Sequence, residues 1–62
     1  MNAEKIYTTL TNTGFTVEPC YPYLIVSLNR SINTTEVWAA LNFECSTDGW
    51  ARSDGKVWVK CA

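Results

Sequence analysis

The first dozen residues carry their apolar side chains with a helical period. Apolar residues occupy positions 3, 6, 7 and 10, which form one face of a helix. Asn2 stands before this face and suits an N-cap, while Gly14 stands after it, where a left-handed residue commonly ends a helix. The pattern predicts an amphipathic helix from Asn2 to Thr13.

Capping residues predict a second helix in the middle of the chain. Asn33 suits the N-cap, and Glu36 follows at the position that completes a capping box. The apolar residues at 32 and 37 occupy the two positions of a hydrophobic staple. We expect this helix to run to about Leu41 and to stop at Asn42, because asparagine tolerates a left-handed backbone.

Three further segments have the composition of strands. Phe15–Glu18 alternates apolar and polar residues, and Phe43–Cys45 does so over a shorter run. Tyr23–Leu28 is apolar on both faces, which is typical of a central strand. Pro19 and Pro22 cannot donate to a strand ladder, so the segment between them is predicted to be a turn or an irregular connection.

The C-terminal segment, from residue 49 to residue 61, has the pattern of a β-hairpin. The Asp-Gly pair at 54 and 55 suits a two-residue type I′ turn, which fixes the pairing of the two strands. Side-chain alternation then separates the two tryptophans. Trp50 joins the valines at 57 and 59 on an apolar face, while Trp58 lies between Lys56 and Lys60 on the opposite face.

Together these segments predict an α+β domain. Two short helices would pack on one face of a small antiparallel sheet of about four strands, in the order αββαββ. A chain of 62 residues supports a single small domain, residues 1–62. Cap, helix, left-handed stop and phenylalanine-led strand recur at a spacing of about thirty residues, which suggests a weak internal duplication of an αββ unit.

A winged helix-turn-helix is an alternative arrangement of the same segments. It would use the C-terminal hairpin as the wing and Thr47–Ser53 as the DNA-recognition helix. That segment contains a glycine and a single basic residue, and its sequence is typical of a turn followed by a strand. The small sheet domain is therefore the favoured interpretation.

Composition and charge narrow the classes of function. Hydrophobic residues make up 47% of the chain and aromatic residues 13%, which is typical of a globular domain. The net charge of -1 does not favour a general, phosphate-driven affinity for nucleic acid. The apolar runs are far shorter than the ~20 residues of a membrane span, and Met1–Lys5 lacks the pattern of a signal peptide. We therefore expect a cytoplasmic protein with no membrane partner.

Cysteine usage and the absence of histidine limit metal and catalytic chemistry. Cys20, Cys45 and Cys61 have no CxxC spacing, so we expect free thiols rather than disulfides or a zinc site. The acidic residues have simpler functions in caps and turns, and Cys61 beside Lys60 is the one thiol that a positive neighbour could activate. We expect no enzyme activity, no catalytic, metal-binding or cofactor-binding residues, and no cofactor.

The candidate partner-binding residues surround Trp58. Lys56 and Lys60 lie on either side of it, and Tyr23 belongs to a strand that could lie next to it. Aromatic rings bordered by lysines suit contact with an acidic protein surface or with a nucleic-acid backbone. The structural alternative is that the lysine stems, together with Tyr23 or Ile25, cover Trp58 on the outer side of the sheet.

We interpret the chain as a small non-enzymatic protein-binding module. It would act by occluding a surface of another protein, as an inhibitor or accessory protein of the type that phages and mobile elements encode. This interpretation depends on the lack of catalytic groups and on four aromatic surface candidates, Tyr21, Tyr23, Trp38 and Trp58. No motif identifies the partner. One alternative is a nucleic-acid-binding, winged-helix-like regulator, and another is a self-associating structural protein that forms a homodimer through an exposed strand face or edge.

Overall fold

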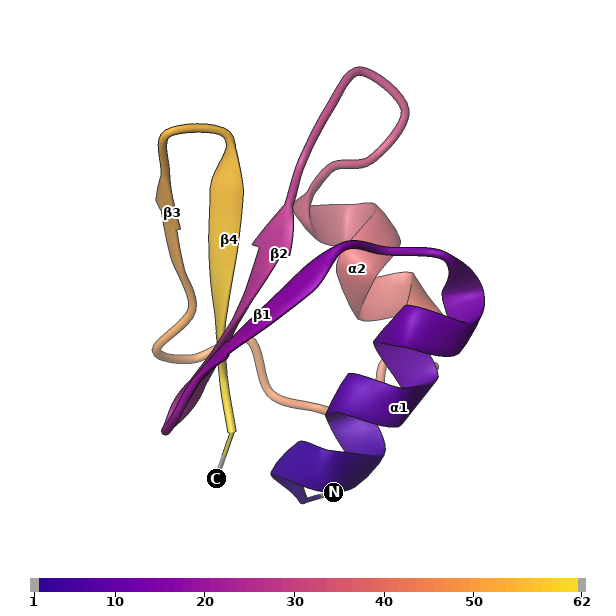
Figure 1. Ribbon diagram of the computed structural model, residues 1–62, viewed down its shortest axis with the longest axis vertical. Helices are drawn as coiled ribbons and strands as arrows, with labels where there is room; N and C mark the ends of the chain where they lie inside the picture. The colour runs from indigo at the N-terminus through magenta and orange to yellow at the C-terminus, as the bar shows by residue number, and fades with distance from the viewer. Residues whose placement is uncertain (1, 62) are drawn as a thin grey trace.

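The computed structural model describes residues 2–61, which form two layers. The elements follow one another in the order α1 (Ala3–Thr13), β1 (Val17–Cys20), β2 (Tyr23–Ser27), α2 (Thr34–Ala40), β3 (Ala51–Ser53) and β4 (Lys56–Lys60). The strands form one antiparallel sheet in the order β1-β2-β4-β3, and both helices lie on the same side of it (Figure 1). The predicted α+β class is confirmed.

Both helices begin at the predicted asparagine caps. The Asn2 side chain accepts a hydrogen bond from the Lys5 backbone N–H at 2.8 Å, and Asn33 accepts one from the Glu36 N–H at 3.0 Å. Each bond satisfies one of the backbone donors that a helix leaves free in its first turn. The first helix ends at Gly14, whose φ of 105° is readily adopted by a residue without a Cβ.

The chain after α2 does not form the strand that we predicted over Phe43–Cys45. Asn42 and Phe43 both have a φ of 57°, so the backbone turns in the left-handed region instead of extending. The predicted left-handed residue at Asn42 is thus confirmed, and the left-handed conformation extends to Phe43 as well. The Trp38 indole N–H then donates to the Cys45 carbonyl at 2.8 Å, which fixes the segment against the helix.

The first hairpin is displaced from its predicted position. Strand β1 starts at Val17 rather than Phe15, and it includes Pro19 and Cys20, which we had placed in a turn or an irregular connection. A turn does form, over residues 21 and 22. Pro19 pairs with Leu24. A proline is tolerated there because β1 is an edge strand and needs hydrogen bonds on one side only. The apolar strand β2 lies in the centre of the sheet, as predicted.

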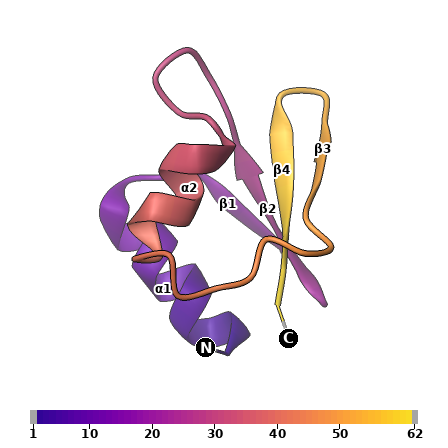
Figure 2. The ribbon, with the colours of Figure 1, turned by 180° about the vertical axis from the view of Figure 1, so that it is seen from behind.

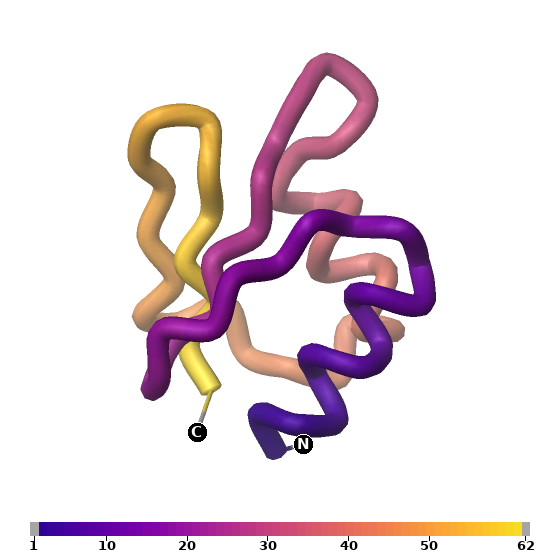
Figure 3. The backbone as a smooth tube through the Cα atoms, in the orientation of Figure 1, coloured from indigo at the N-terminus to yellow at the C-terminus, as the bar shows by residue number. Residues whose placement is uncertain are grey.

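The C-terminal hairpin has the predicted turn and register. Asp54 and Gly55 have φ values of 54° and 71°, as a type I′ turn requires, and Ala51 pairs with Trp58. Trp50 packs against the core, as predicted, but it lies just before β3. The backbone trace shows each helix followed by a hairpin (Figure 3). The internal duplication remains a hypothesis.

No helix forms over Thr47–Ser53, where a winged helix would place its recognition helix. Two turn residues at 48 and 49 lead into β3 in this segment. Figure 2 shows the stretch between α2 and β3 as an irregular connection from the helical layer to the edge of the sheet. The winged-helix alternative is therefore wrong, because this sequence forms a turn and a strand.

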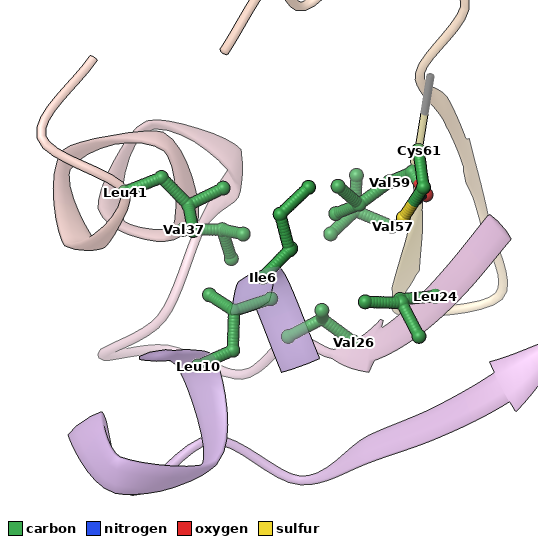
Figure 4. Packing of buried hydrophobic residues seen from close by; sticks show 9 residues of the cluster. All are labelled: Ile6, Leu10, Leu24, Val26, Val37, Leu41, Val57, Val59 and Cys61. Atoms are coloured by element: carbon green, nitrogen blue, oxygen red, sulfur yellow. Dashed lines mark hydrogen bonds between the residues drawn. The ribbon is translucent and has the colours of Figure 1, made fainter. Parts of the chain in front are cut away.

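The core lies between the helices and one face of the two central strands. Side chains from α1, α2, β2 and β4 converge there (Figure 4). The buried residues are Ile6, Leu10, Leu24, Val26, Val37, Leu41, Val57, Val59 and Cys61. Neither described helix has the length and apolar character needed to cross a membrane.

Candidate functional site

The candidate site is the face of the sheet that points away from both helices. We call it the outer face and define it by Tyr23, Ile25, Lys56, Trp58 and Lys60. The intervening residues of β2 and β4 are buried beneath the helices, so alternation directs these five side chains to the other side. The structure therefore brings together all four predicted partner-binding residues and adds Ile25.

The strand register sets the neighbours of Trp58. Ile25 of β2 and Ala51 of β3 lie directly opposite it, one on each side. The Tyr23 and Trp58 rings meet edge to face, with their centroids 5.8 Å apart and their planes at 70°. This is a favoured geometry for two aromatic rings. Tyr23, Ile25 and Trp58 are each partly exposed, so the pair retains ring surface that water reaches.

The two lysines stand at opposite ends of β4. Lys56 pairs with Ser27, and Lys60 pairs with Tyr23. Both lysines are exposed, as expected for ammonium groups that remain hydrated. The outer face thus has an apolar centre with a positive charge at each end of its central strand.

Gly49 determines where the Lys60 stem lies. A Cβ added to Gly49 would come within 2.8 Å of the Lys60 Cδ and within 3.7 Å of its Nζ. The glycine also has a φ of +84°, which disfavours other residues. The lysine stem therefore occupies the space that a side chain at position 49 would fill. The structural alternative was that Tyr23 or Ile25 and the lysine stems cover Trp58. In the structure Tyr23 and Ile25 lie beside Trp58, but the Lys60 stem lies along Gly49.

Two aromatic side chains outside the outer face are more exposed. Tyr21, at the tip of the first hairpin, is 63% exposed, and Phe43 is 57% exposed. Phe43 was missed because we assigned it to a strand, although the left-handed residue predicted at Asn42 was a signal that the chain turns there. Trp38, an aromatic surface candidate in sequence terms, is only partly exposed and packs against Phe43.

The thiol that a lysine could have activated is in an unsuitable environment. Cys61 is buried, and its Sγ lies 3.8 Å from the Val59 carbonyl oxygen. Burial raises the pKa of the Cys61 thiol, and the Cys45 thiol raises it further. The pKa shift is thus opposite to the one that nucleophilic chemistry requires. Cys20 is exposed and Cys45 is partly buried.

No family model, curated protein or solved structure matches this chain. Across residues 2–61 no three cysteine or acidic side chains are placed to share a metal ion. The outer face is therefore interpreted from its own contacts and charges.

Proposed function

We propose that the chain is a small protein-binding module that uses its outer face. The observation that carries the proposal is the partly exposed Tyr23–Trp58 pair on the side of the sheet opposite the helices. Tryptophan and tyrosine are enriched among residues that dominate binding energy, because they bury a large area at a low entropic cost. Lys56 and Lys60 favour a partner surface that places carboxylates around an apolar centre.

The size of the chain is compatible with such a contact. A standard protein interface covers about 800 Å² on each partner. That is roughly a fifth of the 4048 Å² that the chain exposes, so one face of a four-stranded sheet is a reasonable footprint. In this proposal the chain acts in the cytoplasm without catalysis. It occludes the partner surface as an inhibitor or accessory protein of phage or mobile-element type.

The test is affinity capture from the lysate of the native host with charge-reversed baits. Lys56→Glu combined with Lys60→Glu should remove the captured partner, since both charges that flank the aromatic pair are reversed. Lys5→Glu combined with Arg52→Glu is the matched control, because neither residue belongs to the outer face. A partner that the control loses equally, or that the outer-face variant retains, would refute the proposal.

Binding of single-stranded nucleic acid is a second candidate for the same surface. An open antiparallel sheet with aromatic rings can stack unpaired bases, and nearby lysines can contact phosphates. The net charge of -1 makes this the weaker candidate. It requires quenching of Trp58 fluorescence by an oligonucleotide. If both lysines contact phosphates, the affinity should fall about sevenfold between 50 and 200 mM salt. The variant Trp58→Phe would identify the tryptophan that responds.

A further inference from the structure

The exposed ring of Phe43 is held in a fixed position. The Phe43 backbone N–H donates to the Trp38 carbonyl at 3.2 Å. The two rings meet nearly perpendicularly, with centroids 4.7 Å apart and planes at 88°. The Trp38 indole is itself anchored by its hydrogen bond to the Cys45 carbonyl. These contacts hold the exposed Phe43 ring in one position.

The backbone at Phe43 adopts a conformation that such a residue rarely takes. Its φ of 57° is in the left-handed region, where asparagine is common and bulky side chains are uncommon. The conformation costs free energy, and it directs a large apolar side chain into solvent. An exposed, fixed aromatic ring of this kind has the properties of an anchor residue in an interface.

The charges around Phe43 are the opposite of those on the outer face. Residues 31–51 contain three acidic residues and no lysine or arginine. Two of them, Glu44 and Asp48, are exposed in the same irregular connection as Phe43. We call Phe43, Glu44 and Asp48 the acidic loop. It presents an exposed aromatic ring and two exposed carboxylates, whereas the outer face presents an aromatic pair with ammonium groups at both ends.

Phe43 cannot reach the Tyr23–Trp58 pair of its own chain, although Asp48 precedes Gly49, which lies against the Lys60 stem. Phe43 packs against Trp38 of α2. Helix α2 lies on one side of the sheet (Figures 1 and 2), and alternation along β4 places Trp58 on the other side. A second copy of the chain can, however, bring its acidic loop to the outer face of the first. The contact would join two different surfaces, so it leaves a free acidic loop at one end and a free outer face at the other.

We propose that the acidic loop docks on the outer face of a second copy of this chain. Phe43 would pack against the Tyr23–Trp58 pair, with Glu44 and Asp48 near Lys56 and Lys60. This inference depends on the proposed function, because it names a partner for the same outer face. The contact is head-to-tail, so it produces open chains, or rings if the rotation between copies closes, and their mass rises with concentration and falls in salt.

Sedimentation velocity over a concentration series tests the proposal with two complementary variants. Phe43→Asn removes the ring while keeping a residue that accepts the left-handed backbone. Lys56→Glu with Lys60→Glu keeps the acidic loop and reverses the charges of the outer face. Each variant alone should remain near 7.0 kDa, whereas the wild type should increase in mass with concentration.

A mixture of the two variants gives the decisive result. The Phe43→Asn chain keeps an intact outer face, and the lysine variant keeps an intact acidic loop. The acidic loop of the lysine variant can therefore dock on the outer face of the Phe43→Asn chain. A head-to-tail contact provides that pairing, so the 1:1 mixture should form a dimer of twice 7.0 kDa and stop there. A symmetric contact between two outer faces would instead let Phe43→Asn associate by itself.

Failure of this inference can be separated from failure of the proposed function. A wild-type chain that stays monomeric at every concentration, or a variant mixture that stays monomeric, overturns the head-to-tail contact. If a host protein is still captured through Lys56 and Lys60 in that case, the protein-binding function stands. If neither self-association nor capture depends on the two lysines, both proposals fail.

Discussion

Strands β2 and β4 have two faces that differ sharply in their surroundings. On the inner face, Leu24, Val26, Val57 and Val59 are each 0% exposed. On the outer face, the residues that alternate with them are partly or fully exposed. The same backbone thus carries a packed core on one side and an open aromatic surface on the other. The inner residues are explained by folding, whereas the outer aromatic residues are not required to complete the core.

The largest expected difference between the faces concerns neighbouring residues of β2. Leu24→Ala should lower the free energy of unfolding by about 2–5 kcal/mol, because it leaves a cavity in the core. A domain of this size has a total stability near the low end of about 5–15 kcal/mol, so much of the variant should be unfolded. Ile25→Ala is the control on the outer face. Equal losses for the two variants in urea denaturation would contradict the contrast.

A smaller effect is expected for Gly49→Ala, which acts on both stability and the outer face. Alanine at a left-handed φ should cost about 1–2 kcal/mol, and its Cβ should displace the flexible Lys60 stem. Gly55→Ala is the matched control, because its φ is +71° and no atom lies within 4 Å of the added Cβ. Both variants should lose similar stability. Only Gly49→Ala should also weaken partner capture, and equal capture by the two would show that the position of Lys60 is unimportant.

The aromatic pair should contribute less again to the folded state. A double-mutant cycle with Tyr23→Ala and Trp58→Ala isolates the energy of their edge-to-face contact, for which we expect about 0.5–1.5 kcal/mol. Each single variant should remain folded by circular dichroism, since neither residue belongs to the buried core. Unfolding of Trp58→Ala would show that the outer face is a structural element, and it would remove the basis for a contact surface there.

The smallest effect concerns alkaline pH and the inner-face thiol. The folded state raises the pKa of Cys61, so the native chain retains a proton that the unfolded chain loses. The associated stability is fully present below the unfolded thiol pKa of about 8.5 and is lost as the pH rises toward the raised native value. Cys61→Ala should therefore weaken the loss of stability between pH 8 and 10. Val37→Ala, at a buried residue without a titratable group, is the control and should leave that pH dependence unchanged.

Local signals predicted the elements whose conformation depends on neighbouring residues. Asn2 and Asn33 cap the helices as expected, and the turn at Asp54 and Gly55 fixes the hairpin register. The prediction of a strand over Phe43–Cys45 was wrong, because an alternation of only three residues is compatible with an extended backbone and with a turn. Its conformation is decided by contacts with Trp38, which precedes it in α2.

The sequence predicted only that part of the candidate site that follows from the alternation of side chains along a strand. The register around the Asp-Gly turn placed Trp58 with Lys56 and Lys60, and the structure places them on one face. The position of the Lys60 stem depends on Gly49, which precedes β3 and is brought beside β4 by the fold. The exposure of Phe43 likewise depends on the left-handed turn and on its packing, which alternation does not describe.

Pro19 limits the directions in which this molecule can add neighbours. A strand that paired with the free edge of β1 would lack one hydrogen bond, because the backbone nitrogen of Pro19 carries no hydrogen. The other edge, β3, is only three residues long and has the charged Arg52 at its centre. Both edges of the sheet therefore disfavour the addition of a further strand. Growth, where it occurs, is expected along the normal to the sheet, by stacking layers rather than by lengthening the hydrogen-bonded row.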